Sequence, residues 1–410
     1  MKIWIKLIIG SGIGIFVSIF YPDFVNQAEP VLSYISNLVI HFGRFLLFPL
    51  IFFSLAIGIH ELRQEKKLLK TYGRAVFYTI VATFVFALVG VLMVLIFSPD
   101  RIPIIIEEEA AFSIPGLQEI LIRLFPKDFF SIFIENGNFI LPIYIFAVFF
   151  GLNFAFDRLS TRPVNQFFDS ISRIFYHANT FVLEILPVGI MVVVSFLIVR
   201  MQNVPELSIF SELFFIIGVA TAFVVLVLLP LIMYLLTGGE NPYKWLYAII
   251  APAVTGFISG DIFFSYGMMV KHGKESFGVP RKTGAPVYPL LAMFSKAGTA
   301  MVSVITFFII ITSYSNLEIQ FAQILWILVM AFLLSFVLFS VPASGVIVLL
   351  SLLCSMYGNG IEEGFLIIKP VAPLLMSFGV FLDVITASFI AYLTARHEGL
   401  QKEIRIRDYV

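Results

Sequence analysis

Three charged residues lie inside long apolar runs of the chain, where they could hold or transfer charge. Lys296 lies near the middle of a run from about 283 to 313, and Asp261 and Asp383 lie at comparable depth in other runs. Such a run crosses a hydrocarbon core of about 30 Å, so the Lys296 ammonium cannot easily reach either surface. A charge at this depth is costly unless it has a partner or a water-filled cavity. We therefore expect the three charges to lie together.

Each of these residues also has a purely structural interpretation. Asp261 could be only the N-cap of a helix, where its side chain accepts hydrogen bonds from free backbone N–H groups. Lys296 and Asp383 could form an ion pair that fixes helix packing and does nothing else. Gly298 and Gly345 could serve only to let two helices approach closely.

The composition is that of a helical membrane protein. Of the 410 residues, 60% are hydrophobic and 13% charged, and the mean hydropathy is +1.01. The formal net charge is +0 and the basic residues cluster at helix ends, so we expect no nucleic-acid partner. The single cysteine, Cys354, excludes a disulfide framework and offers no metal cluster. We expect residues 1–21 to be a retained first helix.

Hydropathy predicts an all-α polytopic protein with eight transmembrane spans and two re-entrant helical hairpins. The segments 244–275 and 320–357 are interrupted by Ser259-Gly260-Asp261 and by residues 341–345. Each interruption leaves two arms of roughly fifteen residues, which are too short to cross comfortably. The single crossings are expected at about 3–21, 35–60, 75–98, 129–156, 168–199 and 209–237, in the Lys296 run, and at 363–395.

Charged residues in the connections predict the orientation. With a cytoplasmic amino terminus and each hairpin returning to its own side, three basic clusters fall inside and the acidic residues 107–109 fall outside. The carboxyl terminus is then cytoplasmic too. The basic clusters are Arg63, Lys66, Lys67, Lys70 and Arg74; Lys271, Lys274, Arg281 and Lys282; and Arg396, Lys402, Arg405 and Arg407.

Several segments together resemble one transporter family. They are R-F-L-L-F-P-L-I-F-F-S-L-A-I-G at 44–58, N-G-N-F-I-L-P at 136–142, P-V-G at 187–189, P-L-L-A-M-F-S-K-A-G-T at 289–299 and S-V-P-A-S-G at 340–345. With the order of spans and hairpins, they are similar to the dicarboxylate/amino acid:cation symporter family, of the glutamate-transporter type. The resemblance covers nearly the whole chain.

The resemblance implies a homotrimer in which scaffold helices hold an elevator-type transport core. We expect scaffold helices in 1–74, a third helix with an external loop in 75–128, further scaffold helices in 129–208, a sixth helix in 209–243, and the transport core in 244–410. It also implies an integral protein of the cytoplasmic (inner) membrane.

The chain departs from the family in the Lys296 run. Where the family has N-M-D-G-T, which holds sodium ions, this chain has S-K-A-G-T at 295–299. The resemblance therefore implies that Ala297 replaces a sodium ligand and that Lys296 adds a fixed positive charge.

The last span departs as well. Matching A-R-H-E-G at 395–399 to the family's A-K-T-E-G places Asp383 at a family Asn and Gly379 at the Arg that holds an acidic side chain. The same match places Met376 at the ammonium-binding Asp and Ala387 at a sodium-binding Asp. A slip of four residues would instead place Asp383 at the ammonium-binding Asp, and both registers stay open.

We therefore expect a secondary-active transporter, and not an enzyme, for a small polar organic solute such as a neutral amino acid or organic acid. Sodium coupling is not expected, because Lys296 can act as a tethered cation. Metals and cofactors are not expected either, because the sequence has no metal-ligand cluster or phosphate-binding loop. A proton exchanged between Lys296 and an Asp could instead couple transport to a proton gradient. A channel or a non-transporting receptor is the alternative. The expected substrate-binding residues are Ser259, Gly260, Asp261, Ala343, Ser344, Gly345, Thr299, Gly379, Asp383 and Thr386, with Lys296, Asp383 and Asp261 as the charge-carrying set.

Overall fold

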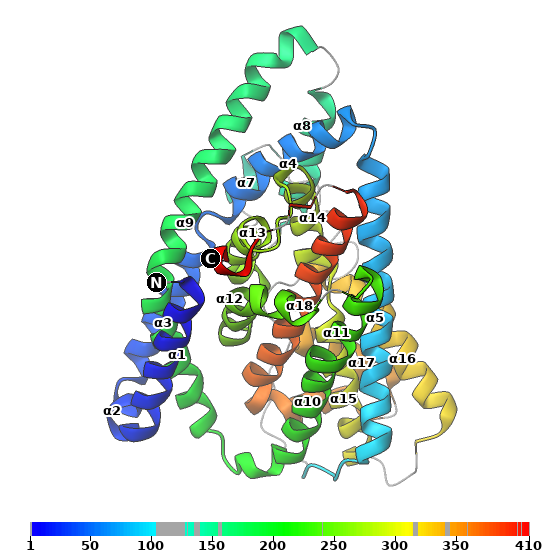
Figure 1. The fold of residues 1–410 in the computed structure, drawn as a ribbon. Helices are drawn as coiled ribbons and strands as arrows, with labels where there is room; N and C mark the ends of the chain where they lie inside the picture. The colour runs from blue at the N-terminus through cyan, green and yellow to red at the C-terminus, as the bar shows by residue number, and fades with distance from the viewer. Residues whose placement is uncertain are drawn as a thin grey trace.

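The computed structural model describes residues 2–103, 128, 130–134, 140–154, 158–239, 241–314, 319–340, 345–358, 360–399, 401–402 and 404–409. These residues form helices and no strand (Figure 1). The helices are α1 (Ile3–Phe20), α2 (Pro22–Gln27), α3 (Glu29–Arg44), α4 (Leu47–Gln64), α5 (Leu68–Phe97), α7 (Ser131–Ile134), α8 (Leu141–Asn153), α9 (Arg158–Gln202), α10 (Ser211–Phe223), α11 (Leu229–Thr237), α12 (Tyr243–Ser259), α13 (Ile262–Glu275), α14 (Arg281–Phe294), α15 (Ala297–Tyr314), α16 (Phe321–Ser335), α17 (Gly345–Tyr357) and α18 (Ala372–His397).

Eight helical segments of the described residues are long and apolar enough to cross a membrane, which confirms a polytopic all-α protein. Two segments differ from expectation. The fourth expected span, 129–156, is described only in part and contains the short helices α7 and α8. The first arm of the second hairpin was expected to be too short, but the segment Phe321–Phe339 is 19 residues long and could cross alone. A 3-10 turn at Phe336–Ser340 extends α16 up to the interruption.

The first interruption ends a helix as the sequence predicts. Gly260 has a left-handed φ of +58° and caps α12, and α13 begins directly after Asp261. Glycine adopts this conformation without steric cost, so the chain can turn back here. The two helices pack against each other, and α12 also packs on α18.

The Lys296 run is one span made of two helices. α14 ends at Phe294 and α15 begins at Ala297, and between them the Lys296 N–H donates to the Phe294 carbonyl at 3.0 Å. In the most apolar window of the segment Arg281–Tyr314, 94% of residues are buried, against 28% for α1. The span is therefore central. In Figure 1, α1, α3 and α9 lie on one side of α12 and α18, and α5 lies on the other.

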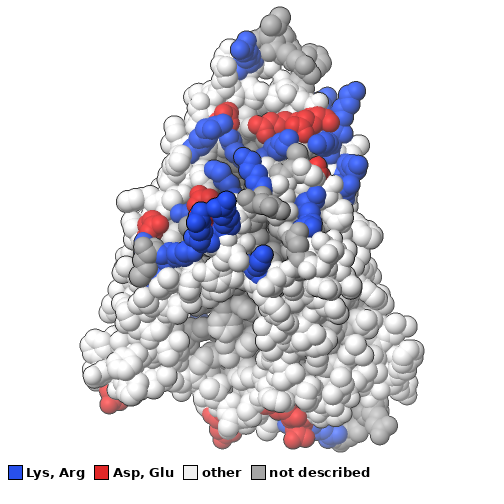
Figure 2. Space-filling model, in the orientation of Figure 1, with Lys and Arg blue, Asp and Glu red and all other residues white. Residues whose placement is uncertain are grey.

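The three basic connections meet at one end of the molecule. The Lys282 ammonium donates to Glu65 at 2.7 Å and lowers the pKa of that carboxyl, and the backbone N–H of Lys402 donates to the Gly278 carbonyl at 3.0 Å. Figure 2 shows most blue side chains over the upper part of the molecule, above a belt of uncharged surface. This grouping is what the positive-inside rule requires of the predicted topology.

Candidate functional site

Asp383 binds the beginning of α15. Its side chain is fully buried and accepts hydrogen bonds from the backbone N–H of Gly298 at 2.7 Å, from that of Thr299 at 3.1 Å, and from the Thr299 hydroxyl at 2.6 Å. The first N–H groups of a helix have no partner within the helix, and they favour a negative charge. The Asp383 carboxylate on α18 therefore caps the N-terminus of α15, and both of its oxygens accept hydrogen bonds from that helix.

Small residues allow this contact. A Cβ atom at Gly298 would lie 2.3 Å from Leu382 Cβ and 2.5 Å from the Gly379 carbonyl oxygen. A Cβ atom at Gly345 would lie 3.3 Å from Thr299 Cγ2. The beginnings of α15 and α17 thus meet the middle of α18, and four of the predicted site residues, Thr299, Gly345, Gly379 and Asp383, lie together.

Asp261 is the N-cap of α13 and also half of an ion pair. The residue is buried, and its side chain accepts a hydrogen bond from the Phe263 N–H at 2.9 Å and pairs with the guanidinium of Arg44 at the end of α3. Asp261 therefore caps α13 as the structural interpretation expects, but capping is not its only contact. The Arg44 partner was missed, although the sequence held the signal: Arg44 is itself a charge inside the apolar stretch 35–60.

Lys296 has no carboxylate in contact. It is 2% exposed, and its ammonium has neither a hydrogen bond nor a salt bridge within 4.0 Å among the described residues. Asp383 and Asp261 attract it only from a longer distance. Both carboxylates lie within electrostatic range of Lys296, but neither forms a direct ion pair with it, because α15 occupies Asp383 and Arg44 occupies Asp261.

The remaining predicted residues divide into three groups. Ser259 and Thr386 donate their hydroxyl hydrogens to carbonyls within their own helices, at 2.7 Å in both cases, so neither offers a free donor. Gly260 lies against the beginning of α18, since a Cβ atom there would be 3.6 Å from Met376 Cβ. Ala343 and Ser344 lie outside the described residues.

The Ser295 hydroxyl is a further free donor that the sequence analysis did not assign to the site. It is fully buried next to Lys296 and has no hydrogen-bond partner in the described part of the chain. Its position in the break between α14 and α15 is the signal that could have identified it. The Lys296 ammonium and the Ser295 hydroxyl belong to adjacent residues, and both lack a hydrogen-bond acceptor among the described residues. A solute with an acid group could supply one.

A comparison with known protein families identifies the family of this chain. Residues 1–397 match the model of the sodium:dicarboxylate symporter family. The chain belongs to this family.

Curated relatives share little of the chain's sequence, and two of those named here match it over most of their own length. The proton/sodium-glutamate symport protein of Geobacillus stearothermophilus is 22% identical over all of this chain and 96% of its own. The C4-dicarboxylate transport protein 2 of Ralstonia nicotianae is 23% identical over 84% of this chain and 78% of its own. The human neutral amino acid transporter B(0) is 29% identical over 53% of this chain and 40% of its own.

Family membership establishes the general activity. The chain is a secondary transporter of the dicarboxylate and amino acid class, embedded in a membrane, and not an enzyme. Within the described residues, no group of three or more His, Cys, Asp or Glu side chains could hold a metal ion.

Proposed function

We propose that this protein carries a small polar organic solute with an acid group, such as a neutral amino acid or an organic acid, without sodium. The observation that supports this most is the buried Lys296 ammonium, which has no acceptor in the described part of the chain. A fixed cation at the break between α14 and α15 repels a mobile cation nearby, and it attracts a carboxylate.

The relatives support a carboxylate-bearing solute. Their names specify glutamate, C4-dicarboxylates and neutral amino acids. We infer that a solute carboxylate binds the Lys296 ammonium and the Ser295 hydroxyl, close to Thr299 and Gly345. A second carboxylate would find little compensation, because no Arg lies between residues 371 and 395. Glutamate and aspartate are thus not the preferred solutes.

We further propose how the solute crosses the inner membrane. In three assembled copies, the hairpins with α14, α15 and α18 would move as a transport core against scaffold helices that include α1, α3 and α9. Both termini would be cytoplasmic. Lys296 would either remain charged as a tethered cation or exchange a proton with an Asp, and in the second case a proton gradient would drive uptake.

The test begins with ligand discovery. Purified protein is heated with alanine, serine, glutamate, succinate or fumarate, since a ligand that binds only the folded state raises the melting temperature. A stabilising compound is then loaded into proteoliposomes, and entry of its radiolabelled form is measured. Exchange that requires internal unlabelled solute supports a carrier. Flux that depends only on the gradient indicates a channel, and binding without flux indicates a receptor.

A further inference from the structure

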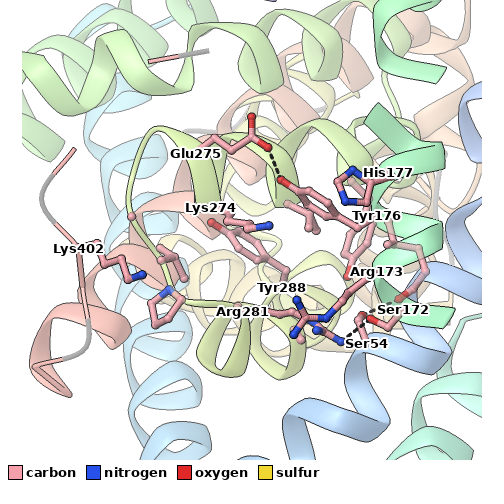
Figure 3. A pocket seen from close by; sticks show the side chains of 18 residues that line it. Ser54, Ser172, Arg173, Tyr176, His177, Lys274, Glu275, Arg281, Tyr288 and Lys402 are labelled. Atoms are coloured by element: carbon pink, nitrogen blue, oxygen red, sulfur yellow. Dashed lines mark hydrogen bonds between the residues drawn. The ribbon is translucent and has the colours of Figure 1, made fainter. Parts of the chain in front are cut away.

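A cavity outside the proposed transport site opens at the basic end of the molecule. Its volume is about 480 Å³, and it lies between α9 on one side and α13 and α14 on the other (Figure 3). Arg173, His177, Lys274, Arg281 and Tyr288 line it together with Lys402 of the tail. Figure 3 shows Lys274, Arg173 and Arg281 directed toward one space, with Lys402 at the opposite edge.

The cavity has more cations than carboxylates. Arg281 and Arg173 share one carboxylate, Asp169, at 2.5 Å and 3.1 Å. Glu275, the one acidic residue among the described lining residues, accepts a hydrogen bond from the Tyr176 hydroxyl at 2.5 Å. Of the lining side chains that the structure describes and their direct partners, four are cationic and two are anionic, which leaves an excess of two positive charges in this set. This excess favours an anion with a charge of one or two.

One charged group of the cavity is free to bind an anion. The Lys274 ammonium lies 4.0 Å from the Tyr176 ring centroid, and no carboxylate of the described residues lies within 4.0 Å of it. The Tyr288 side chain is 1% exposed, and its hydroxyl has no hydrogen-bond partner in the part of the chain that the structure describes. A Cβ atom at Gly273 would lie 1.9 Å from this oxygen, so the hydroxyl packs against α13 and the Lys274 ammonium is the group that is open to a ligand.

The rest of the lining is apolar. Leu50, Val270, Val279 and Ala285 face the same space. The cavity therefore combines cationic donors with an apolar wall, which suits an anion that carries a hydrocarbon part.

We propose that this cavity binds a phosphate ester. A phosphate group presents several acceptor oxygens and a charge that matches the excess, and guanidinium and ammonium groups bind it well. The ester comes from an anionic phospholipid headgroup or from a soluble phosphorylated metabolite. In either case the ligand contacts α9 as well as α13 and α14, so it holds these helices together.

The experiment uses the full-length protein in a neutral detergent. Its melting temperature is measured during titration with dihexanoyl phosphatidylglycerol, dihexanoyl phosphatidylcholine or glycerol 3-phosphate. A saturable rise with phosphatidylglycerol alone identifies a lipid headgroup, and a rise with glycerol 3-phosphate identifies a soluble ester. Lys274→Gln removes one charged contact, so we expect it to weaken binding by about tenfold.

The controls separate this cavity from general attraction to a basic surface. Lys70→Gln removes the same charge from an exposed position of α5, outside the cavity, and should bind like the wild type. If Lys274→Gln does not fold, Lys402→Gln in the exposed tail provides the second cavity variant. The proposal is overturned if no phosphate ester raises the melting temperature, or if the cavity variants bind as tightly as Lys70→Gln. It does not depend on the solute or ion that the protein transports.

Discussion

The charge of Lys296 is balanced only from a distance, by two carboxylates whose hydrogen bonds are directed elsewhere. Asp383 serves the beginning of α15, and Asp261 serves α13 and Arg44. Residues that remain within electrostatic range in an apolar surrounding still influence one another, although less than a contacting pair does.

We therefore expect energetic coupling between Lys296 and Asp383. Lys296→Met and Asp383→Asn should each lower thermal stability, and the double variant should lose less than the sum of the two. An interaction energy on the order of 0.5–3 kcal/mol is reasonable. The measurement is a double-mutant cycle of thermal unfolding in detergent.

A parallel cycle with Asp261→Asn shows which carboxylate matters more to Lys296. If both cycles are additive within about 0.5 kcal/mol, water, backbone carbonyls or solute satisfy the ammonium. The tethered-cation mechanism would then lose its main support.

At the scale of elements, one ion pair connects the tip of the first hairpin to α3. The side chain of Asp261 is 2% exposed and that of Arg44 is 16% exposed, so both charges lie largely outside water. Breaking a buried pair by removing one partner typically costs about 3–5 kcal/mol, because the other charge is left uncompensated.

Arg44→Gln should therefore destabilise the protein strongly, and adding Asp261→Asn should recover part of the loss. Melting temperatures of the two single variants and the double variant provide the measurement. A double variant that is less stable than either single variant would show that the pair does not hold the hairpin to α3.

The contact between α15 and α18 depends on the absence of a side chain at Gly298. In Gly298→Ala, the new Cβ would lie 2.3 Å from Leu382 Cβ, and this overpacking should cost about 1–3 kcal/mol. Thermal unfolding measures the loss.

Gly218→Ala is the matched control, because no atom within 4 Å would meet its Cβ in α10. Alanine is the better helix former there by about 1 kcal/mol, so this variant should be as stable as the wild type or more stable. Equal melting temperatures for Gly298→Ala and the wild type would contradict the close packing.

At the scale of the whole molecule, hydropathy and small residues predicted most of the helical framework. Ser259-Gly260-Asp261 indicated the turn between α12 and α13, because this signal is local. Tertiary partners were not predictable in this way. Arg44 and Asp261 are separated by 217 residues in the sequence, and Asp383 and Gly298 by 85. Neither contact can therefore be predicted from a short-range sequence pattern.

The proposed scaffold and the proposed moving core would meet where α9 contacts α13 and α14. Motion between these two parts stays a proposal. We propose that Lys296 takes the place of a bound sodium ion, because this chain has S-K-A-G-T at 295–299 where the resembled family has its sodium-binding N-M-D-G-T.

The most direct test compares the thermal stability of the purified protein in sodium chloride and in choline chloride at equal ionic strength. A site saturated about a hundredfold above its dissociation constant would stabilise the folded protein by about 2.7 kcal/mol. We expect equal melting temperatures in the two salts, because the Lys296 ammonium repels a bound cation. A melting temperature that rises steeply and saturably with sodium concentration would contradict sodium-independent transport.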